Sequence, residues 1–122
     1  MKALLKTLFV TAAAALLFIV APVLTNPAQA ADIQAGGQLF SANCAVCHQG
    51  GNNTIMNIKT LKVDALEKFL DGYGPNHNPE AIVKQVTYGK GMMPAFRNRL
   101  TDEDIANVAA YVQDQSESGW QS

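Results

Sequence analysis

The sequence predicts a small all-α domain of about four helices. Apolar residues recur at the three- and four-residue spacing of one helix face, and capping residues, prolines and glycines flank these segments. The strict alternation of apolar and polar residues that marks a half-buried strand is missing, and no two-residue hairpin turn joins two apolar runs. The chain is therefore expected to consist of helices joined by loops that contain glycine and proline.

Residues 1–30 are predicted to be a secretory signal peptide. Two lysines form a positive start, residues 8–24 are nearly all apolar, and Ala-Gln-Ala at positions 28–30 fits the small-x-small cleavage pattern. A retained membrane anchor is the alternative, because the apolar stretch is near the length that spans a bilayer. Pro22 and the cleavage pattern favour removal. We expect cleavage before Ala31, export by the general route, and a mature protein that does not span the membrane.

The mature chain, residues 31–122, is expected to be one domain of 92 residues. Without the two lysines of the leader, seven basic residues stand against ten acidic ones, so its net charge is about −3. This balance argues against a nucleic-acid partner, which requires a basic surface. A domain of this size is marginally stable alone, and a large apolar group attached to it would enlarge its core.

The first helix is expected from Asp32, which can cap its N-terminus, to about Asn43. Gly36 and Gly37 are adjacent in this segment and cost about 1 kcal/mol each relative to alanine. Close approach of another helix would explain them, and a frayed first turn is the alternative. The predicted apolar face comprises Ile33, Gly37 and Phe40, with Gly36 and Leu39 beside it.

Two helices are expected in the middle of the chain. One spans residues 61–70, after a loop over residues 52–60, and ends before a segment with two glycines and a proline. The other spans residues 79–88, and its start is well marked because Asn78 can cap it and Pro79 occupies the first helical position. The side chains predicted to be buried are Leu66, Phe69 and Leu70 in the first helix and Ile82, Val83 and Val86 in the second.

The last helix has the clearest pattern. Thr101 and Asp104 resemble a capping box, with Asp104 in place of the usual Glu or Gln. Tyr111 borders the expected buried face, and Trp120, beyond the helix, is expected to fold back on the surface. The buried stripe has the spacing i, i+3, i+4 and i+7 and comprises Ile105, Val108, Ala109 and Val112.

The chain is organised around Cys44-Ala45-Val46-Cys47-His48. C-x-x-C-H is the pattern of covalent c-type haem attachment, in which the thiols add to the porphyrin vinyl groups and the histidine binds iron from the proximal side. One alternative is half of a zinc site, but the sequence has no second cysteine pair. Another is a thioredoxin-like redox pair, but the strand–helix–strand alternation of that fold is absent. The third is a chance match. The predicted export of the chain agrees with the haem interpretation, because covalent haem attachment takes place on the far side of a membrane. Because both cysteines would be thioethers, we expect no disulfide.

Met93 is predicted to be the second axial ligand of the iron. It lies in Gly-Lys-Gly-Met-Met-Pro, whose glycines let the backbone pass close to the ring, while Pro94 holds Met93 extended and stiffens the loop. A thioether raises the reduction potential, whereas an open position would permit ligand binding or peroxide chemistry. Met92 should point away. The alternatives are that both methionines are core filler, or that Met56 or His77, which we interpret as a surface residue, is the ligand.

The mature chain resembles the class I c-type cytochromes, and most closely the cytochrome c6 (cytochrome c-553) family of oxygenic photosynthesis. The similarity covers nearly all of residues 31–122. C-x-x-C-H indicates only a c-type haem, whereas Met-Pro-Ala-Phe at 93–96 and the Gly-Trp tail are more specific. The other matching residues are Gly36, Phe40, Lys59-Thr60-Leu61, Gln85-Val86-Thr87, Gly89-Lys90-Gly91, Leu100, Tyr111-Val112 and Gln115-Ser116-Glu117.

This resemblance implies a small class I cytochrome c fold of about four helices around one covalently bound haem c. It implies that the N- and C-terminal helices cross at Gly36, Phe40 and Tyr111, and that His48 and Met93 are the axial ligands. It also implies a soluble, monomeric one-electron carrier, not an enzyme, in the thylakoid lumen or the periplasm. The implied electron donor is the cytochrome b6f complex and the implied acceptor is photosystem I, with a terminal oxidase as an alternative acceptor.

Three features depart from the family pattern and indicate a divergent paralogue. Tyr88 stands where Asn is usual, the loop over residues 72–79 is a few residues longer, and Arg97 adds a positive charge near Arg99. Gln85 agrees with the photosynthetic donors and is expected to belong to the haem environment; a lower-potential branch of the family has an apolar residue there.

Lys90, Arg97 and Arg99 lie near Met93 in an otherwise acidic chain. We expect them to form a small positive docking site beside an exposed haem edge, complementary to an acidic patch on the electron acceptor. Incidental charges on a solvated loop are the alternative. Two other functions remain open: the same haem module in a respiratory or specialised dehydrogenase chain, and a haem sensor or enzyme with an open distal site.

Overall fold

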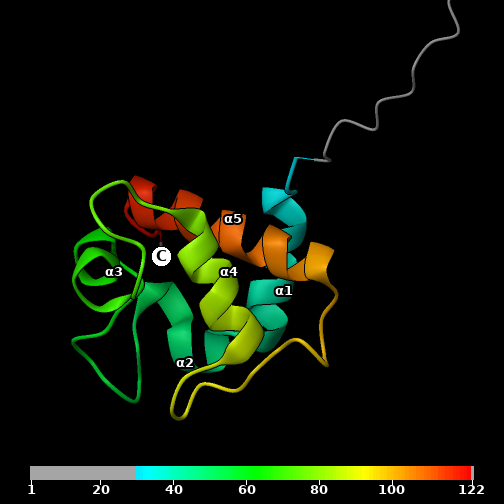
Figure 1. Ribbon diagram of the computed structural model, residues 1–122, viewed down its shortest axis with the longest axis horizontal. Helices are drawn as coiled ribbons and strands as arrows, with labels where there is room; N and C mark the ends of the chain where they lie inside the picture. Colours follow the sequence, from blue (N-terminus) through cyan, green and yellow to red (C-terminus); the bar gives the residue numbers. More distant parts are fainter. Residues whose placement is uncertain (1–29, 122) are drawn as a thin grey trace, which may run out of the picture.

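Helices α1 (Ile33–Asn43) and α5 (Asp102–Ser118) pack against each other at the centre of the computed structural model, which describes residues 30–121 (Figure 1). The short helix α2 (Ala45–His48) and the 3-10 turn η1 (Gln49–Gly51) follow α1. Helix α3 (Val63–Phe69) comes next, and α4 (Pro79–Tyr88) packs against α5. The all-α prediction is confirmed, and α2 is an additional helix where the sequence predicted only a turn.

The crossing of α1 and α5 depends on one glycine. A Cβ atom added to Gly36 would lie 2.0 Å from the carbonyl oxygen of Asn107 and 2.9 Å from Cβ of Tyr111, so only glycine fits between the two helices. The rings of Phe40 and Tyr111 lie beside this point with their centroids 5.3 Å apart. The predicted crossing at these three residues is confirmed.

The predicted starts of α1, α4 and α5 agree with the structure because local hydrogen bonds determine them. The side chain of Asp32 accepts from the backbone N–H of Ala35, and that of Asn78 accepts from Glu80. Thr101 and Asp104 form the full capping box, in which each side chain accepts from the other residue's backbone N–H at 3.1 Å.

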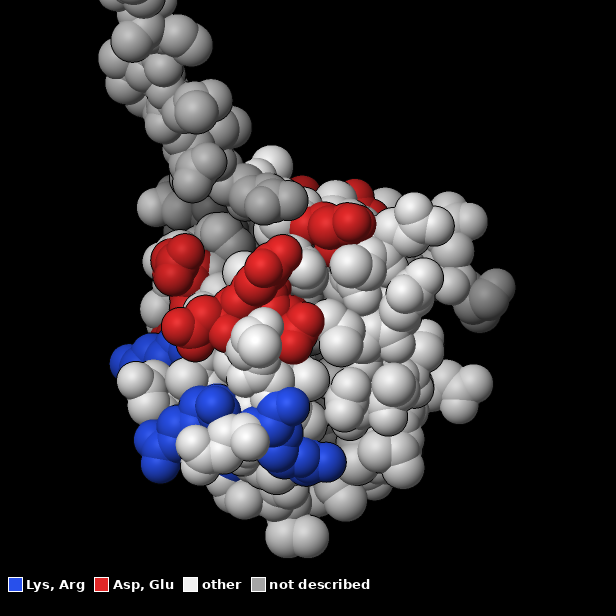
Figure 2. All heavy atoms as spheres, turned by 90° about the vertical axis from the view of Figure 1, so that its right-hand side faces the viewer, with Lys and Arg blue, Asp and Glu red and all other residues white. Residues whose placement is uncertain are grey.

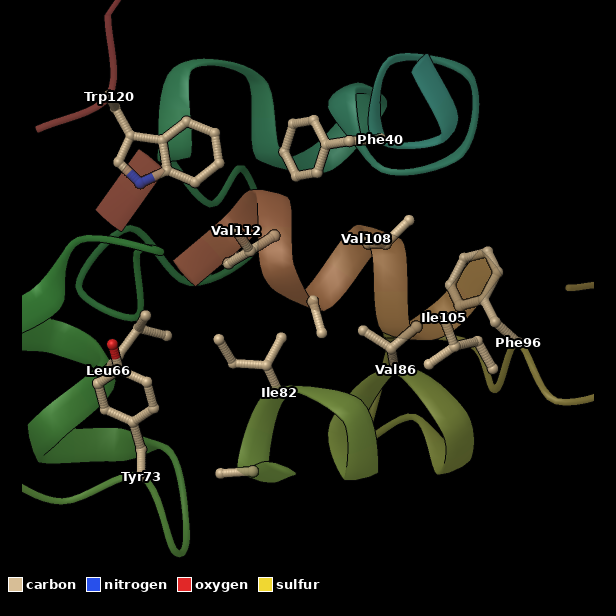
Figure 3. Close-up of a cluster of buried hydrophobic side chains, with 12 residues drawn as sticks. Phe40, Leu66, Tyr73, Ile82, Val86, Phe96, Ile105, Val108, Val112 and Trp120 are labelled. Carbon is tan, nitrogen blue, oxygen red and sulfur yellow. The ribbon is translucent and has the colours of Figure 1, made fainter. Parts of the chain in front are cut away.

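The hydrophobic core lies between α5 and the elements around it (Figure 3). The predicted stripe of α5 is buried along its whole length, and α4 contributes Ile82 and Val86. Tyr73, in the loop between α3 and α4, is only 1% exposed, so this loop is anchored in the core. The remaining large core residues include Phe40, Leu66, Phe96 and Trp120.

Three expectations about individual residues were wrong. The helix predicted from position 61 begins at Val63, because Leu61 donates its N–H to the distant Gly51 carbonyl and Lys62 is extended. Ile33 was placed on the apolar face of α1 but is 43% exposed, since the buried face centres on Gly36 and Phe40. Trp120 does fold back, but it is buried and not on the surface.

The signal-peptide prediction falls on residues 1–29, which lie outside the described part of the chain. Within residues 30–121, every helix is too short or too polar to cross a bilayer. The boundary of the mature domain at residue 31 stays a prediction.

Candidate haem site

The C-x-x-C-H segment forms one helical turn directly after α1. The backbone N–H of Cys44 donates to Phe40, which continues α1, and the carbonyl of Cys44 accepts from the N–H groups of Cys47 at 3.1 Å and His48 at 2.9 Å. Both thiols are free and half-buried, and burial raises the pKa of Cys44 to about 11. The turn therefore presents two free thiols about one helical turn apart, followed at once by the imidazole.

The ring of His48 has a defined tautomer. Its Nδ1 lies 3.0 Å from the backbone carbonyl oxygen of Asn52. A carbonyl can only accept, so Nδ1 carries the proton and donates it, which leaves the lone pair of Nε2 available to a metal. A hydrogen bond of this kind also fixes the ring orientation and increases the basicity of the coordinating nitrogen.

The loop that follows holds the Asn52 carbonyl in place. Asn52 donates its own N–H to Gln49, and Thr54 donates to the carbonyl of Cys47 at 3.1 Å. The side chain of Asn53 accepts from the N–H groups of Ile55 and Met56 and donates to the carbonyl of Lys59. Sequence reasoning missed Asn53, although asparagine side chains often make such local bonds to the backbone. It also missed Asn52, whose contribution is its backbone carbonyl.

Met93 lies in a tight loop after α4. Lys90 and Met93 exchange two backbone hydrogen bonds, at 3.0 and 3.1 Å, which close the loop into an isolated bridge. Gly89 allows this closure, because a Cβ there would lie 2.4 Å from the Met93 carbonyl oxygen. Met93 is half-buried and packs against the core, while Met92 is 78% exposed. The exposed side chain of Met92 and the half-buried side chain of Met93 thus point in different directions, as predicted for adjacent residues of an extended segment.

The other candidate axial ligands are less suitable. Met56 is 46% exposed. His77 has both ring nitrogens engaged: Nε2 lies 2.7 Å from Glu67 and Nδ1 lies 3.5 Å from Glu117. Its ring also stacks on the buried ring of Tyr73. His77 is thus a partly exposed residue, as interpreted from the sequence, and its contacts with Glu67 and Glu117 occupy both ring nitrogens.

The donor set of the site is two thiols, one imidazole and one thioether, which is the set that holds a c-type haem. Cys44 and Met93 pack against the same hydrophobic core, so that core is continuous between the two parts of the site. Several large apolar side chains in the flanking segments remain exposed, which agrees with a bound apolar group that the polypeptide alone does not replace. They are Val46, Ile55 and Ile58.

Gln85 is half-buried on α4 and lines a hollow of about 190 Å³ whose rim also includes Tyr88 and Lys90. Lys90 is paired with Asp71 at 3.2 Å, whereas in the described part of the chain no acidic group lies within ion-pair distance of Arg97 or Arg99.

The two arginines lie over aromatic rings. The guanidinium of Arg97 lies 5.6 Å from the ring centre of Tyr88, and that of Arg99 lies 5.1 Å from that of Phe96. Figure 2 shows basic side chains gathered directly below a group of acidic side chains on one face. The charges of that face are therefore separated and not evenly mixed.

Comparisons with known proteins agree with this site. Residues 31–112 match the family model described as cytochrome c oxidase, cbb3-type, subunit III. Cytochrome c6 of Picosynechococcus sp. is 59% identical over 95 residues, which cover 76% of this chain and 81% of the relative. Cytochrome c6 of Gracilaria tenuistipitata is 53% identical, and the match covers 84% of this chain and 94% of the relative.

Solved structures of cytochromes of the c6 type are also similar to this chain. The structure of cytochrome c6 from the diatom Phaeodactylum tricornutum superposes with a TM-score of 0.69 at 55% identity, covering 73% of this chain and 99% of that one. Cytochrome c6C from Synechococcus sp. PCC 7002 superposes with a TM-score of 0.64 at 42% identity, covering 70% of this chain and 99% of that one.

Proposed function

The chain belongs to the cytochrome c6 family, and from this premise we propose that it carries single electrons from the cytochrome b6f complex to photosystem I. Like the other members of the family, it is an electron carrier with one covalently bound haem c, and it is not an enzyme. What the proposal adds is the identity of the residues that hold the haem, the two partners and the direction of transfer.

Cys44 and Cys47 are the proposed thioether attachments, and His48 and Met93 are the proposed axial ligands. When bound, the haem iron takes up and releases one electron. His48 supplies Nε2 because its Nδ1–H is donated to Asn52. Met93 supplies a neutral sulfur from a loop closed at both ends, and such a ligand favours the ferrous state and a high reduction potential. Gln85 is the proposed polar neighbour of the ring.

The observation that carries this proposal is the hydrogen bond between His48 Nδ1 and the Asn52 carbonyl. This bond leaves Nε2 of His48 available to bind iron. His48 directly follows Cys47 in the sequence, and the two thiols have the spacing of haem attachment. Met93 then provides the second ligand, and a haem with both axial positions filled transfers electrons instead of activating a small molecule. Carbon monoxide should therefore not bind the native ferrous protein at neutral pH, and rapid binding would favour the open-site alternative.

Arg97 and Arg99 are the proposed docking residues for the acceptor, with Lys90 as a weaker member. Lys90 is partly neutralised by Asp71, whereas the two arginines retain their charge for a partner. Exposed charges of this kind raise the encounter rate more than the affinity, and salt screens them within about 10 Å at 0.1 M. The docking contact is proposed to be transient and made by a monomer.

A terminal oxidase is a second candidate acceptor. The matching family model carries the description of an oxidase subunit, and that description is the specific observation that favours it. Export of the mature chain to the thylakoid lumen or periplasm would give access to either acceptor. The cleavage site before Ala31 is part of the proposal.

The experiment that tests the function is flash-induced reduction of photosystem I by the purified, reduced holoprotein. The observed rate should increase in proportion to the concentration of the carrier, and oxidised cytochrome should form in equal amount. A parallel measurement with a purified terminal oxidase compares the two acceptors. Absence of transfer to photosystem I, together with rapid oxidation by the oxidase, would overturn the assignment of the acceptor.

A further inference from the structure

We propose that Trp120 is a positioning residue for the proximal ligand: its indole holds the turn after the C-x-x-C-H motif so that the Asn52 carbonyl stays aimed at His48. The proposal rests on the assignment of His48 as a ligand. It concerns a residue near the C-terminus that is 72 positions away from that histidine in the sequence.

The end of α5 is built to bring Trp120 back. Gly119 has a left-handed backbone with φ of 89°, and both Gly119 and Trp120 donate their N–H groups to the carbonyl of Gln115, at 3.0 and 2.8 Å. Trp120 itself has φ of 37°, a conformation that a bulky residue adopts only when its surroundings hold it there. The reversal returns the indole to the core next to α1 (Figure 3).

The indole contacts two aromatic rings and donates one hydrogen bond. Its ring centre lies 5.3 Å from that of Phe40 and 6.1 Å from that of Tyr111, the two aromatic residues of the helix crossing. Its Nε1–H donates to the carbonyl oxygen of Leu61 at 2.9 Å. Trp120 therefore connects the helix crossing to the end of the loop over residues 52–60.

The same indole packs against η1, the turn that follows His48. A Cβ atom on Gly51 would lie 2.5 Å from ring atoms of Trp120, so the backbone of Gly51 rests directly on the indole. The carbonyl of Gly51 accepts from the N–H of Leu61 at 2.7 Å, which closes a small circuit of Trp120, Leu61 and Gly51. Neither end of the loop can shift without moving the other.

Asn52, the residue next to Gly51, carries the carbonyl that accepts from His48 Nδ1 at 3.0 Å. Its peptide plane is thus fixed on one side by the braced Gly51 and on the other by the bonds of Asn53. A strong bond to Nδ1–H increases the electron donation of the histidine to bound iron and favours the ferric state. Loosening the brace should weaken this bond and raise the reduction potential.

The first test compares Trp120→Phe with Tyr73→Phe in the holoprotein. Each variant keeps an aromatic ring and loses one long-range hydrogen bond, to Leu61 in the first case and to Ser116 in the second. Trp120→Phe should raise the reduction potential and accelerate solvent exchange of the His48 Nδ1 proton by about tenfold, the loss expected for one neutral hydrogen bond. Tyr73→Phe should change neither quantity, even where it lowers stability. Equal potentials and equal exchange rates in Trp120→Phe and wild type would overturn the proposal.

The second test uses the wild-type holoprotein, so it does not depend on whether a variant folds. Native-state hydrogen exchange in low denaturant should place the Trp120 Nε1 proton, the Leu61 amide proton and the His48 Nδ1 proton in one unit that opens with one free energy. Opening of the Trp120 and Leu61 protons while the His48 proton remains protected would contradict the proposal. If His48 does not ligate a haem, its Nδ1 proton will lack the large paramagnetic shift of an axial ligand, which distinguishes failure of the ligand assignment from failure of this inference.

Discussion

Replacing Gly36 by alanine should destabilise the protein, although alanine is the better helix former. A Cβ at this position would lie 2.0 Å from the Asn107 carbonyl oxygen, whereas ordinary contacts begin near 3.4 Å, so α1 and α5 would have to separate by about 1.4 Å there. The obstacle is backbone, which cannot rotate away as a side chain can. Overpacking of this kind costs about 3 kcal/mol at the upper end of its usual range, and the gain in helix propensity offsets about 1 kcal/mol.

The expected net loss is therefore about 2 kcal/mol, which corresponds to a decrease in Tm of about 8–16 °C for a domain of this size. The matched control is Gly37→Ala in the same helix. Its Cβ would meet only the ring of Tyr111, at 3.0 and 3.2 Å, and a ring can move by a few tenths of an ångström.

Urea denaturation of the three holoproteins, followed by circular dichroism, measures the differences. Gly37→Ala should be as stable as wild type or more stable, whereas Gly36→Ala should be less stable than both. If Gly36→Ala equals or exceeds Gly37→Ala in stability, the crossing does not depend on close backbone contact at this residue.

Three further predictions concern the cofactor, the pH dependence and the docking site. The double variant Cys44→Ser with Cys47→Ser should give mostly apoprotein. Acidic acetone should not extract haem from the denatured wild-type protein, and release of the haem would show that it is not covalently bound. The hydrogen bonds that the His77 ring donates to the carboxylates of Glu67 and then Glu117 raise the pKa of His77. The stabilisation by protonated His77 is therefore complete below the ordinary histidine pKa and is lost as the pH rises through the raised value. Wild type should exceed His77→Asn in stability by more at about pH 5 than at about pH 9, and a pH-independent difference would exclude this linkage. Arg97→Glu with Arg99→Glu should slow transfer to photosystem I at low salt, with the difference from wild type shrinking as salt rises while the potential stays constant; equal rates at low salt would leave the docking site without support.

The parts of the fold that follow local rules could be predicted from the sequence. Asn78 and Pro79 mark the start of α4, and Thr101 with Asp104 marks the start of α5, because these residues satisfy the first N–H groups of a helix by themselves. The buried stripe of α5 follows equally from its spacing.

The parts that depend on distant contacts could not be predicted in this way. The N–H of Leu61 bonds to Gly51 instead of opening α3, and the burial of Trp120 depends on a glycine turn and on partners in α1. His77 has a left-handed backbone, and its two glutamate partners lie in other elements, Glu67 in α3 and Glu117 in α5. In each case the decisive partner lies ten or more positions away in the sequence.

In the candidate site, too, the local motifs could be predicted from the sequence and the contact with a backbone group could not. C-x-x-C-H and the Met-Pro loop are short motifs whose chemistry is evident from the residue types, so the donor set could be proposed at once. The bond between His48 and the Asn52 carbonyl has no side-chain signal, because the acceptor is backbone and any residue at that position could supply it. What determines the tautomer of His48 is thus visible only in the structure.

The near-infrared absorption of the oxidised holoprotein tests most directly the claim that His48 and Met93 bind the haem of an electron carrier. The weak band of sulfur–iron bonding should be present in wild type and in Met92→Leu, which changes only the exposed neighbour. It should disappear in Met93→His, together with a fall in the reduction potential. Persistence of the band in Met93→His, or its loss in Met92→Leu, would contradict the assignment of Met93 as the ligand.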